Sequence, residues 1–368
     1  MPYKNHKLNT LLAAAATGAF AGAFAGSAAA QTNVTLMGLV DAYVGTQRNA
    51  GDTSSRPAVN SSGMTTSWFG FKGTEDLGNG LSAKFALTSF FKTDTGQYGR
   101  FPSDTLWARD ANIGLAGGFG TVTLGRGLAP NFLPSVIFNS FGDSFTFSPL
   151  ILHMDVPLFN GSGWTNGVAG DTGWSNEVIY STPNFKGLSA NVHYQFGEVA
   201  GDNGQRNVGA NVLYFSGPLG LTAYWHNVKV NNPLNSPAGN VQPAGNIPLP
   251  SGLFATRQTS WMVGGSYDFK AVKLFATYGR NSHDIDFDDK TTSLGASLPA
   301  GNGKFIAAWA ETKRSGTAAG ADQKRDTTSI GYVYDLSKRT DVYAVAMNDR
   351  ITSQPSGNSF GLGIRHRF

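Results

Sequence analysis

Residues 357–361 read Gly-Asn-Ser-Phe-Gly and fit the G-x-S-x-G pattern that presents a nucleophilic serine. That chemistry requires the serine on a sharp turn between a strand and a helix. Here the pattern leads into an alternating stretch that predicts a strand, and no convergent Ser/His/acid set can be assembled around it. We interpret the match as coincidental and predict no catalytic site.

Metal ligands are the second kind of chemistry to consider. The histidines after the N-terminal segment show no zinc spacing, and the chain has no cysteine. Four acids cluster near 282–289, namely Asp284, Asp286, Asp288 and Asp289. They are either a divalent-cation site bridging to lipopolysaccharide phosphates or a solvated acidic loop, and the second interpretation is favoured because no Asp-x-Asp-x-Asp-Gly loop is present. We predict no metal and no cofactor.

Composition narrows the class of protein. Charged residues make up only 14% of the 368, aromatic residues 12%, and 47 residues are glycine, which is typical of many short strands and turns. The formal net charge is +4, and removing Lys4 and Lys7 with the N-terminal segment leaves +2. This bias, without a Lys/Arg run, gives no support for nucleic-acid binding.

The N-terminus is predicted to be a cleaved secretory signal. Lys4 and Lys7 precede an apolar stretch from Leu11 to about Phe24, and 27–30 supplies small residues for signal peptidase. We predict a signal peptide over 1–30 and one domain over 31–368. A membrane anchor is the weaker alternative, and no later apolar run reaches the ~20 residues of a membrane helix.

The rest of the chain alternates between apolar and polar residues with a period of two. In 360–368, for example, bulky residues occupy the even positions and small or charged ones the odd positions. About 16 such segments occur, an even number typical of bacterial single-chain barrels. They are 34–45, 64–74, 80–91, 107–116, 119–126, 174–183, 187–197, 206–217, 219–230, 257–270, 271–281, 289–299, 302–313, 325–336, 340–350 and 358–368.

The connections between these segments alternate in length. Short turns are expected at 75–79, 117–118, 184–186, 218, 299–301 and 337–339, and long polar segments at 46–63, 92–106, 127–173, 231–256, 314–324 and 351–357. This pattern predicts an all-β transmembrane antiparallel β-barrel with short periplasmic turns and long extracellular loops.

Aromatic residues near the ends of the apolar rows favour an apolar exterior with interfacial girdles; they are Tyr214, Trp225, Tyr267, Tyr278 and Tyr343. A soluble carbohydrate-binding β-protein is the alternative, with the apolar rows inside. The third long segment, 127–173, is rich in Phe and Leu. An apolar segment on an extracellular rim would be anomalous, so we expect it to fold into the lumen.

Several motifs, in order, resemble the trimeric general porins of Gram-negative bacteria, of the β-proteobacterial type. They are Val34–Asp41, Gly70–Leu81, Gly118–Arg126, Ser175–Pro183 and Gly363–Phe368. The resemblance implies a 16-stranded homotrimer in the outer membrane whose third loop narrows a channel for small polar solutes and ions. It also implies that the barrel assembly machinery recognises the terminal Phe368, which is otherwise an interface aromatic, and that lipid and lipopolysaccharide surround the barrel.

A channel of this type selects solutes by fixed charges in a narrow, water-filled gap. Arg126 matches a pore-facing arginine of the family, although strict alternation places it on the lipid face unless a bulge at Gly125 turns it inward; otherwise it is a rim arginine. Alternation predicts that Lys84, Asp41 and Tyr43 line the lumen. Asp143, and then Asp155, are the acids expected on the loop, unless either is simply solvated.

The chain departs from the family at three positions. Trp68 and Ile179 stand where relatives often have arginine, and Thr88 where they often have an acid. The constriction is therefore expected to be less charged and more aromatic. This favours, as an alternative to a general diffusion channel, one that prefers aromatic or sugar-like solutes. An outer-membrane barrel enzyme is a more distant alternative.

Overall fold

A computed structural model describes residues 33–100, 104–155, 172–198, 200–201, 204, 206–229, 255–286, 288–317 and 323–368. The predicted signal peptide and its cleavage point lie outside the described residues. So do 156–171 of the third long segment and 230–254 of the fourth.

The described residues form seventeen strands and two short helices. The strands are β1 (Asn33–Gln47), β2 (Arg56–Ser61), β3 (Trp68–Gly78), β4 (Leu81–Phe90), β5 (Asp110–Gly117), β6 (Gly120–Leu128), β7 (Gly173–Ser181), β8 (Leu188–Phe196), β9 (Arg206–Ser216), β10 (Leu219–Val228), β11 (Gln258–Asp268), β12 (Lys273–His283), β13 (Asp288–Ala300), β14 (Gly303–Ser315), β15 (Gln323–Asp335), β16 (Thr340–Ile351) and β17 (Gly357–Arg367). The helices are α2 (Phe132–Ile137) and α3 (Pro149–Met154).

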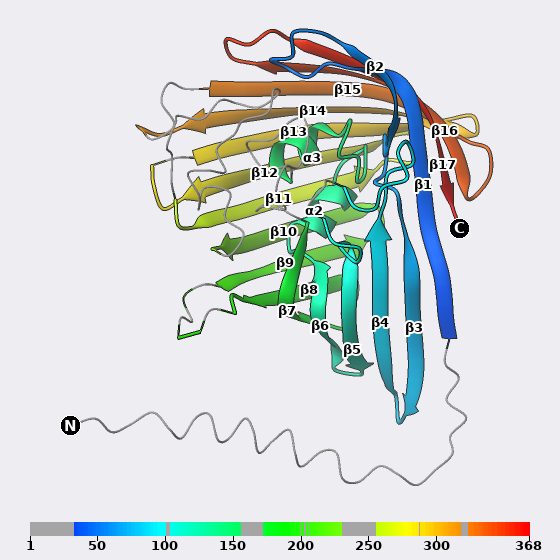
Figure 1. Ribbon diagram of the computed structural model, residues 1–368, viewed down its shortest axis with the longest axis vertical. Coiled ribbons are helices and arrows are strands. Elements are labelled where there is room, and N and C mark those ends of the chain that lie inside the picture. Colours follow the sequence, from blue (N-terminus) through cyan, green and yellow to red (C-terminus); the bar gives the residue numbers. More distant parts are fainter. Residues whose placement is uncertain are drawn as a thin grey trace.

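The strands close into an antiparallel barrel (Figure 1). Each pairs with its neighbour in the chain, and β1 closes the ring by pairing with β17 on one side and β3 on the other. Leaving out β2, a short extra strand that pairs with the far end of β1, the barrel has 16 strands. All 16 expected strands are present, and only β2 was not anticipated.

The outer face of the barrel is apolar. Along β8, for instance, Val192 and Phe196 are exposed, whereas the intervening His193 and Gln195 are buried. Exposed apolar residues recur at every second position on the other strands too, as at Leu362 and Ile364 on β17. The predicted apolar-out arrangement is therefore present. Tyr343 is an exception to the expected girdle, because its side chain is inward and 4% exposed.

Short turns join the strands at one end of the barrel. In the β3–β4 turn, Gly78, Asn79 and Gly80 all have positive φ values (82°, 53° and 74°). Glycine and asparagine tolerate such values best, so these residues allow the chain to reverse within a few positions. β3 runs through most of the turn expected at 75–79, so the reversal lies later than predicted. Asn33, the first described residue, and the C-terminal Phe368 belong to this same end of the barrel.

The described part of the third segment, 129–155, lies inside the barrel. Phe147 stacks edge-on against Tyr43 of β1, with ring centres 5.5 Å apart, while Asn211 of β9 donates to the Pro130 carbonyl. β1 and β9 lie on opposite sides of the ring. A segment that contacts the non-exposed faces of both sides must occupy the interior, where Figure 1 shows α2 and α3. No helix in the described ranges is long and apolar enough to span a membrane.

Candidate functional site

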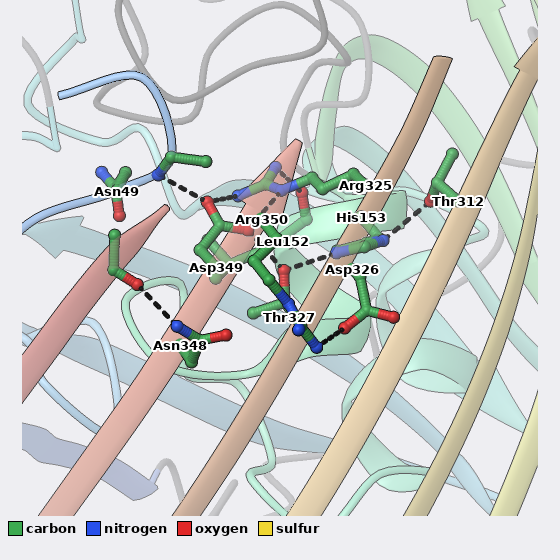
Figure 2. A network of polar contacts seen from close by, with 12 residues as sticks. Asn49, Leu152, His153, Thr312, Arg325, Asp326, Thr327, Asn348, Asp349 and Arg350 are labelled. Atoms are coloured by element: carbon green, nitrogen blue, oxygen red, sulfur yellow. Dashed lines mark hydrogen bonds and ion pairs between the residues drawn. The ribbon is translucent and has the colours of Figure 1, made fainter. Parts of the chain in front are cut away.

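Residues 129–155, which we call the inner segment, are fixed to the barrel wall by a buried polar network at α3 (Figure 2). Arg325 of β15 forms a two-pronged ion pair with Asp349 of β16, at 3.0 and 3.1 Å, and donates to the Leu152 carbonyl at 3.3 Å. His153 is hydrogen-bonded to Thr312 (2.7 Å) and Thr327 (2.8 Å). Burial lowers the pKa of His153 well below its usual value, so the ring is neutral. The network therefore holds the C-terminal end of α3 against β14–β16.

Asp41 anchors a second segment, 63–65, to the barrel wall. Its carboxylate accepts backbone N–H groups from Gly63, Met64 and Thr65 at 2.8–3.0 Å, and the Tyr343 hydroxyl at 2.5 Å. Asp41 and Tyr43 do point inward, as alternation predicts, but they are 0% and 3% exposed. The expectation that they line open water is wrong, because segment 63–65 and Phe147 cover them.

Asp143 lies on the inner segment between the helices. Its carboxylate accepts the Thr65 hydroxyl at 2.9 Å, and that hydroxyl accepts from Arg365 at 2.8 Å. Burial raises the pKa of Asp143 above its usual value, while the Thr65 hydrogen bond and the Arg365 charge oppose that rise. Asp143 is half-buried and lines a cavity, so it is the loop acid that reaches the lumen.

Asp155 has a different environment. It is fully buried and accepts the Asn131 amide at 3.0 Å. Burial raises its pKa to about 7, opposed by hydrogen bonds from Ser135 and Asn131. Asp155 therefore joins the two ends of the inner segment. The expectation that it contributes a charge to the constriction is wrong, because its side chain does not reach the lumen.

Arg126 sits at a bulge in β6. The β6–β7 register shifts between Gly125 and Gly127, and Gly125 has φ +123°. This breaks the strict alternation that would place Arg126 among lipids. Its guanidinium instead donates to the Ala108 carbonyl and, at 2.9 Å, to the Ser175 hydroxyl, and lines the same cavity as Asp143.

Two further arginines, which the sequence reasoning missed, share that cavity. The guanidinium of Arg109 lies 4.0 Å from the centre of the Trp68 ring, and that of Arg100 lies 4.8 Å from the centre of Phe90. Both carry carboxylate partners, Asp110 at 2.6 Å and Asp104 at 2.8 Å. The available signal for Arg109 was a charged residue within the expected strand 107–116, whereas Arg100 lies in the long segment 92–106.

These arginines correct the expectation of a weakly charged constriction. Where the family arginine is replaced by Trp68, Arg109, which directly precedes β5, covers the ring from two strands away. Where the family acid is replaced by Thr88, Asp110 accepts the Thr88 hydroxyl at 2.6 Å. Neighbouring residues thus restore charge near two of the three altered positions, and the aromatic ring is kept.

A second, larger cavity adjoins this one at Leu128. The cavity between the arginines and Asp143 has a volume of about 30 Å³, and the second, lined by Lys84, Asn112 and Asn191, has about 360 Å³. Lys84 is exposed there, as alternation predicts. His193 and His226 also face inward, but they are buried beside Trp174. The smaller cavity therefore brings Arg100, Arg109 and Arg126 together with Asp143.

The residues singled out for other chemistry have structural roles. Ser359 is buried within β17 and exchanges hydrogen bonds with the Arg48 backbone, so it is not on a nucleophile turn. Each acid near 282–289 has its own partner: Thr256 for Asp284, Thr317 for Asp286, Arg280 for Asp288 and Arg314 for Asp289. Among the described residues, no three His, Asp or Glu side chains are placed to hold a metal ion.

An apolar exterior, a polar interior and a charged constriction together define a transmembrane pore. Comparisons with known proteins agree. The chain matches the Gram-negative porin family model over residues 13–354 and belongs to that family. It is 30% identical to an outer membrane porin protein of Bordetella pertussis, covering 98% of this chain and 99% of that protein.

Two more relatives are informative. Outer membrane porin protein 32 of Delftia acidovorans is 31% identical, over 86% of this chain and 84% of that protein. A solved structure, an anion-selective porin from Comamonas acidovorans, is 26% identical and superimposes with a TM-score of 0.72 over 92% of this chain and 100% of the other. The chain is therefore an outer-membrane porin that forms a water-filled channel for passive diffusion of small hydrophilic solutes.

Proposed function

We propose that this porin prefers anions and that its filter is the group of three arginines, Arg100, Arg109 and Arg126, with Trp68 behind Arg109. The observation that carries the proposal is the gathering of three guanidinium groups around one small cavity inside the barrel. Fixed cations in a constricted, partly desolvated gap attract anions and repel cations. Lys84 extends the positive wall into the wider cavity beyond.

Acids also belong to this cavity. Asp143 is the loop acid that lines it together with the arginines. The proposed preference requires the three guanidinium groups to outweigh Asp143 and the partner acids Asp104 and Asp110. The anion-selective porin from Comamonas acidovorans, 26% identical to this chain, supports this inference by similarity.

Reversal potentials test the proposal. The purified porin is inserted into a planar bilayer between two KCl concentrations at pH 7. We expect chloride to be more permeant than potassium, and we expect the preference to weaken at high salt, where charges are screened. A potassium preference, or equal permeability at low salt, would contradict it.

A second candidate is a preference for aromatic or sugar-like solutes. The cavity contains Trp68, Phe90, Phe132 and Phe145 beside the arginines. Such a surface offers stacking to a planar ring and a charged partner to its carboxylate. Benzoate is expected to interrupt single-channel current longer than acetate does, and Trp68→Ala should shorten the benzoate interruptions. Equal interruption times for both anions would remove this candidate.

We further propose a homotrimer. The outward faces of β1, β15, β16 and β17 enclose an apolar hollow of about 570 Å³ lined partly by small residues, including Ala42, Ala344 and Gly363. Side chains of a neighbouring subunit would fill it. A heat-sensitive high-mass band on denaturing gels is expected, and substituting Ala344→Arg should abolish it.

The terminal Phe368 is proposed to be the signal read by the barrel assembly machinery. Its backbone pairs with Gly38 at 3.1 Å and its ring is 43% exposed, so the residue closes the barrel and remains accessible. Phe368→Ala should reduce assembled barrel in cells. If it lowers only the thermal stability, the residue is an interface aromatic alone.

Two other inferences complete the proposal. Cleavage after Ala30 is proposed to leave Gln31 as the first residue of the mature chain, which N-terminal sequencing would test. We also propose that the porin has no catalytic activity, since Ser359 is held within a strand. Esterase assays on the purified protein should give no turnover.

A further inference from the structure

The second cavity, of about 360 Å³, lies on the short-turn side of the three arginines. Its wall is formed by β3 to β9, which are neighbours in the barrel (Figure 1). On β4, Lys84 lies closer to the β3–β4 turn than Thr88, which hydrogen-bonds to Asp110 beside Arg109. Pockets of about 300–1,000 Å³ usually hold small-molecule ligands, so this cavity is large enough for a solute to rest next to the filter.

Two lysines on neighbouring strands bring positive charge to the second cavity. Lys84 of β4 is opposite Thr74 of β3, and Lys72 lies two residues from Thr74, so the lysines are diagonal neighbours on one face of the sheet. Such neighbours lie about 7–8 Å apart, within reach of long side chains. Both lysines are exposed and line the cavity, and neither ammonium group has an ion pair or hydrogen bond within the described residues. They are therefore available to one anionic group.

The acids near the lysines do not neutralise them. Among the described residues, Asp110 is the acid that lines the cavity, and it is bound by Arg109 at 2.6 Å. Asp76, the next position toward the turn on the same face of β3, accepts the Gly78 N–H at 2.8 Å and does not line the cavity. The charge of Lys72 and Lys84 is therefore left for a solute to balance.

Uncharged polar side chains cover the other side of the cavity. In the register, Thr121 of β6 is opposite Ser181 of β7, Ser181 is opposite Asn191 of β8, and Asn191 is opposite Asn211 of β9. We call these four residues the polar row, and all four line the cavity. Asn191 donates to the Asn211 side-chain oxygen at 2.8 Å. The hydroxyls of Thr121 and Ser181 have no hydrogen bond within the described residues, so they can bind a solute.

We propose that the second cavity is a transient binding site for polyhydroxylated carboxylates, the class to which the sugar acids belong. Lys72 and Lys84 hold the carboxylate, and the polar row hydrogen-bonds the hydroxyl groups. This inference rests on the proposed preference for anions and sugar-like solutes, and deepens it by naming one class and the residues that bind it.

The two sides of the cavity are suitably spaced for such a solute. Adjacent strands are about 4.8 Å apart, so β6 and β7 lie about 10–14 Å from β4 along the wall. A flexible lysine stem and a chain of six carbons can span this distance together. Within the described part of the chain no arginine lines this cavity, so the two-pronged contact that favours a phosphate group is missing. A single carboxylate with several hydroxyls matches both sides.

Interruptions of single-channel current test the proposal. Purified porin in a planar bilayer carries a KCl current while gluconate, acetate, glucose or glucose 6-phosphate is added. Gluconate is expected to half-block the current at a concentration at least about fivefold below those of acetate and glucose, because it alone meets both sides of the cavity. Equal block by gluconate and acetate would overturn the proposal by showing a site for charge only. Tighter block by glucose 6-phosphate would overturn it in favour of a phosphate site.

Two variants test the two sides of the cavity separately. Lys72→Gln/Lys84→Gln should weaken the gluconate block at least about fivefold and leave the glucose block unchanged. Thr121→Val/Ser181→Ala should weaken the gluconate block about threefold or more and leave the acetate block unchanged. Because neither hydroxyl has a partner among the described residues, the second variant removes no hydrogen bond from the barrel.

The matched control is Lys270→Gln/Lys338→Gln, which removes two positive charges from the short turns. Gluconate should block it as it blocks the native porin. Equal loss in the control and the lysine variant would overturn the proposal, as would a native gluconate block in either test variant.

Reversal potentials in KCl keep this proposal separate from the anion preference. A porin that prefers potassium, yet is blocked by gluconate through Lys72 and Lys84, would refute the arginine filter and support the second cavity. A porin that prefers chloride, but whose gluconate block survives Lys72→Gln/Lys84→Gln, would refute the second cavity and leave the arginine filter intact.

Discussion

The guanidinium of Arg109 lies 4.0 Å from the centre of the Trp68 ring, so a residue preceding β5 holds its charge in place on an aromatic side chain of β3. Stacking of this kind orients an arginine without neutralising it, which an ion pair alone would tend to do. Asp110 binds the same guanidinium at 2.6 Å and is shared with Thr88. Arg109 is therefore fixed from two sides within the proposed filter.

The first prediction concerns Arg109 itself. Arg109→Gln should lower the chloride-to-potassium permeability ratio by up to about fivefold, since one unit charge at 4 Å in water is worth about 1 kcal/mol. Trp68→Ala should lower the permeability ratio less, because the Arg109 charge remains although the ring no longer holds it in place. Reversal potentials in a KCl gradient measure both. Arg339→Gln, at a short turn, is the control, and an effect there equal to that of Arg109→Gln would show that only net charge matters.

The second prediction concerns the clamp on α3. Arg325→Met leaves Asp349 buried without its cation, and losing one member of a buried pair costs about 3–5 kcal/mol. We expect faster hydrogen exchange at 149–155 and noisier single-channel current. Arg350→Met removes the partner of Asp326 from an exposed pair on the neighbouring strand, which is worth about 1 kcal/mol or less. Similar exchange rates in both variants would refute the clamp.

The third prediction is a pH dependence set by Asp155. Its pKa is about 7 when docked and 3.8 without burial, so the docked inner segment binds one more proton between these values. Docking should therefore weaken as pH rises from about 4 to 7, by about 1.4 kcal/mol per unit, and level off above 7.

Hydrogen exchange at 131–139 between pH 5 and pH 7, corrected for the intrinsic rate, measures this slope. Asp155→Asn should remove it, because the amide keeps a hydrogen-bonding group without the titration. Asp268→Asn, beside a short turn, should leave the slope unchanged. A slope that survives in Asp155→Asn would assign the titration to another group.

Periodicity explains why the barrel was predictable. A period of two is visible in each strand separately, so alternation located all 16 strands, and the aromatic residues at their ends indicated which face meets lipid. β2 was missed because 56–61 is a polar stretch that becomes a strand only by pairing with β1. That pairing is a long-range contact with no local signature.

The constriction was less predictable for a related reason. Alternation says which way Asp41 points, but not that segment 63–65 will cover it. It also does not indicate that Arg109, which lies within the expected strand 107–116, reaches Trp68 two strands away. The candidate site is formed by contacts between segments that do not alternate. The local sequence of each such segment does not show which other segment it will contact.

Gly125 was the one irregularity that the sequence did indicate, and it supports the last prediction. With φ at +123°, an added Cβ would lie 2.3 Å from the Ala111 carbonyl oxygen. Gly125→Ala should therefore destabilise the barrel by about 1–3 kcal/mol and favour regular pairing, which would turn Arg126 toward the lipid.

Two variants separate the loss of the bulge at Gly125 from the loss of the Arg126 charge. Gly125→Ala should reduce chloride preference together with thermal stability, whereas Arg126→Gln should reduce the preference with the bulge retained. Gly118→Ala is the control because its Cβ would meet nothing within 4 Å. If Gly125→Ala lowers stability while selectivity stays native, then Arg126 holds its inward position through Ala108 and Ser175 rather than through the bulge.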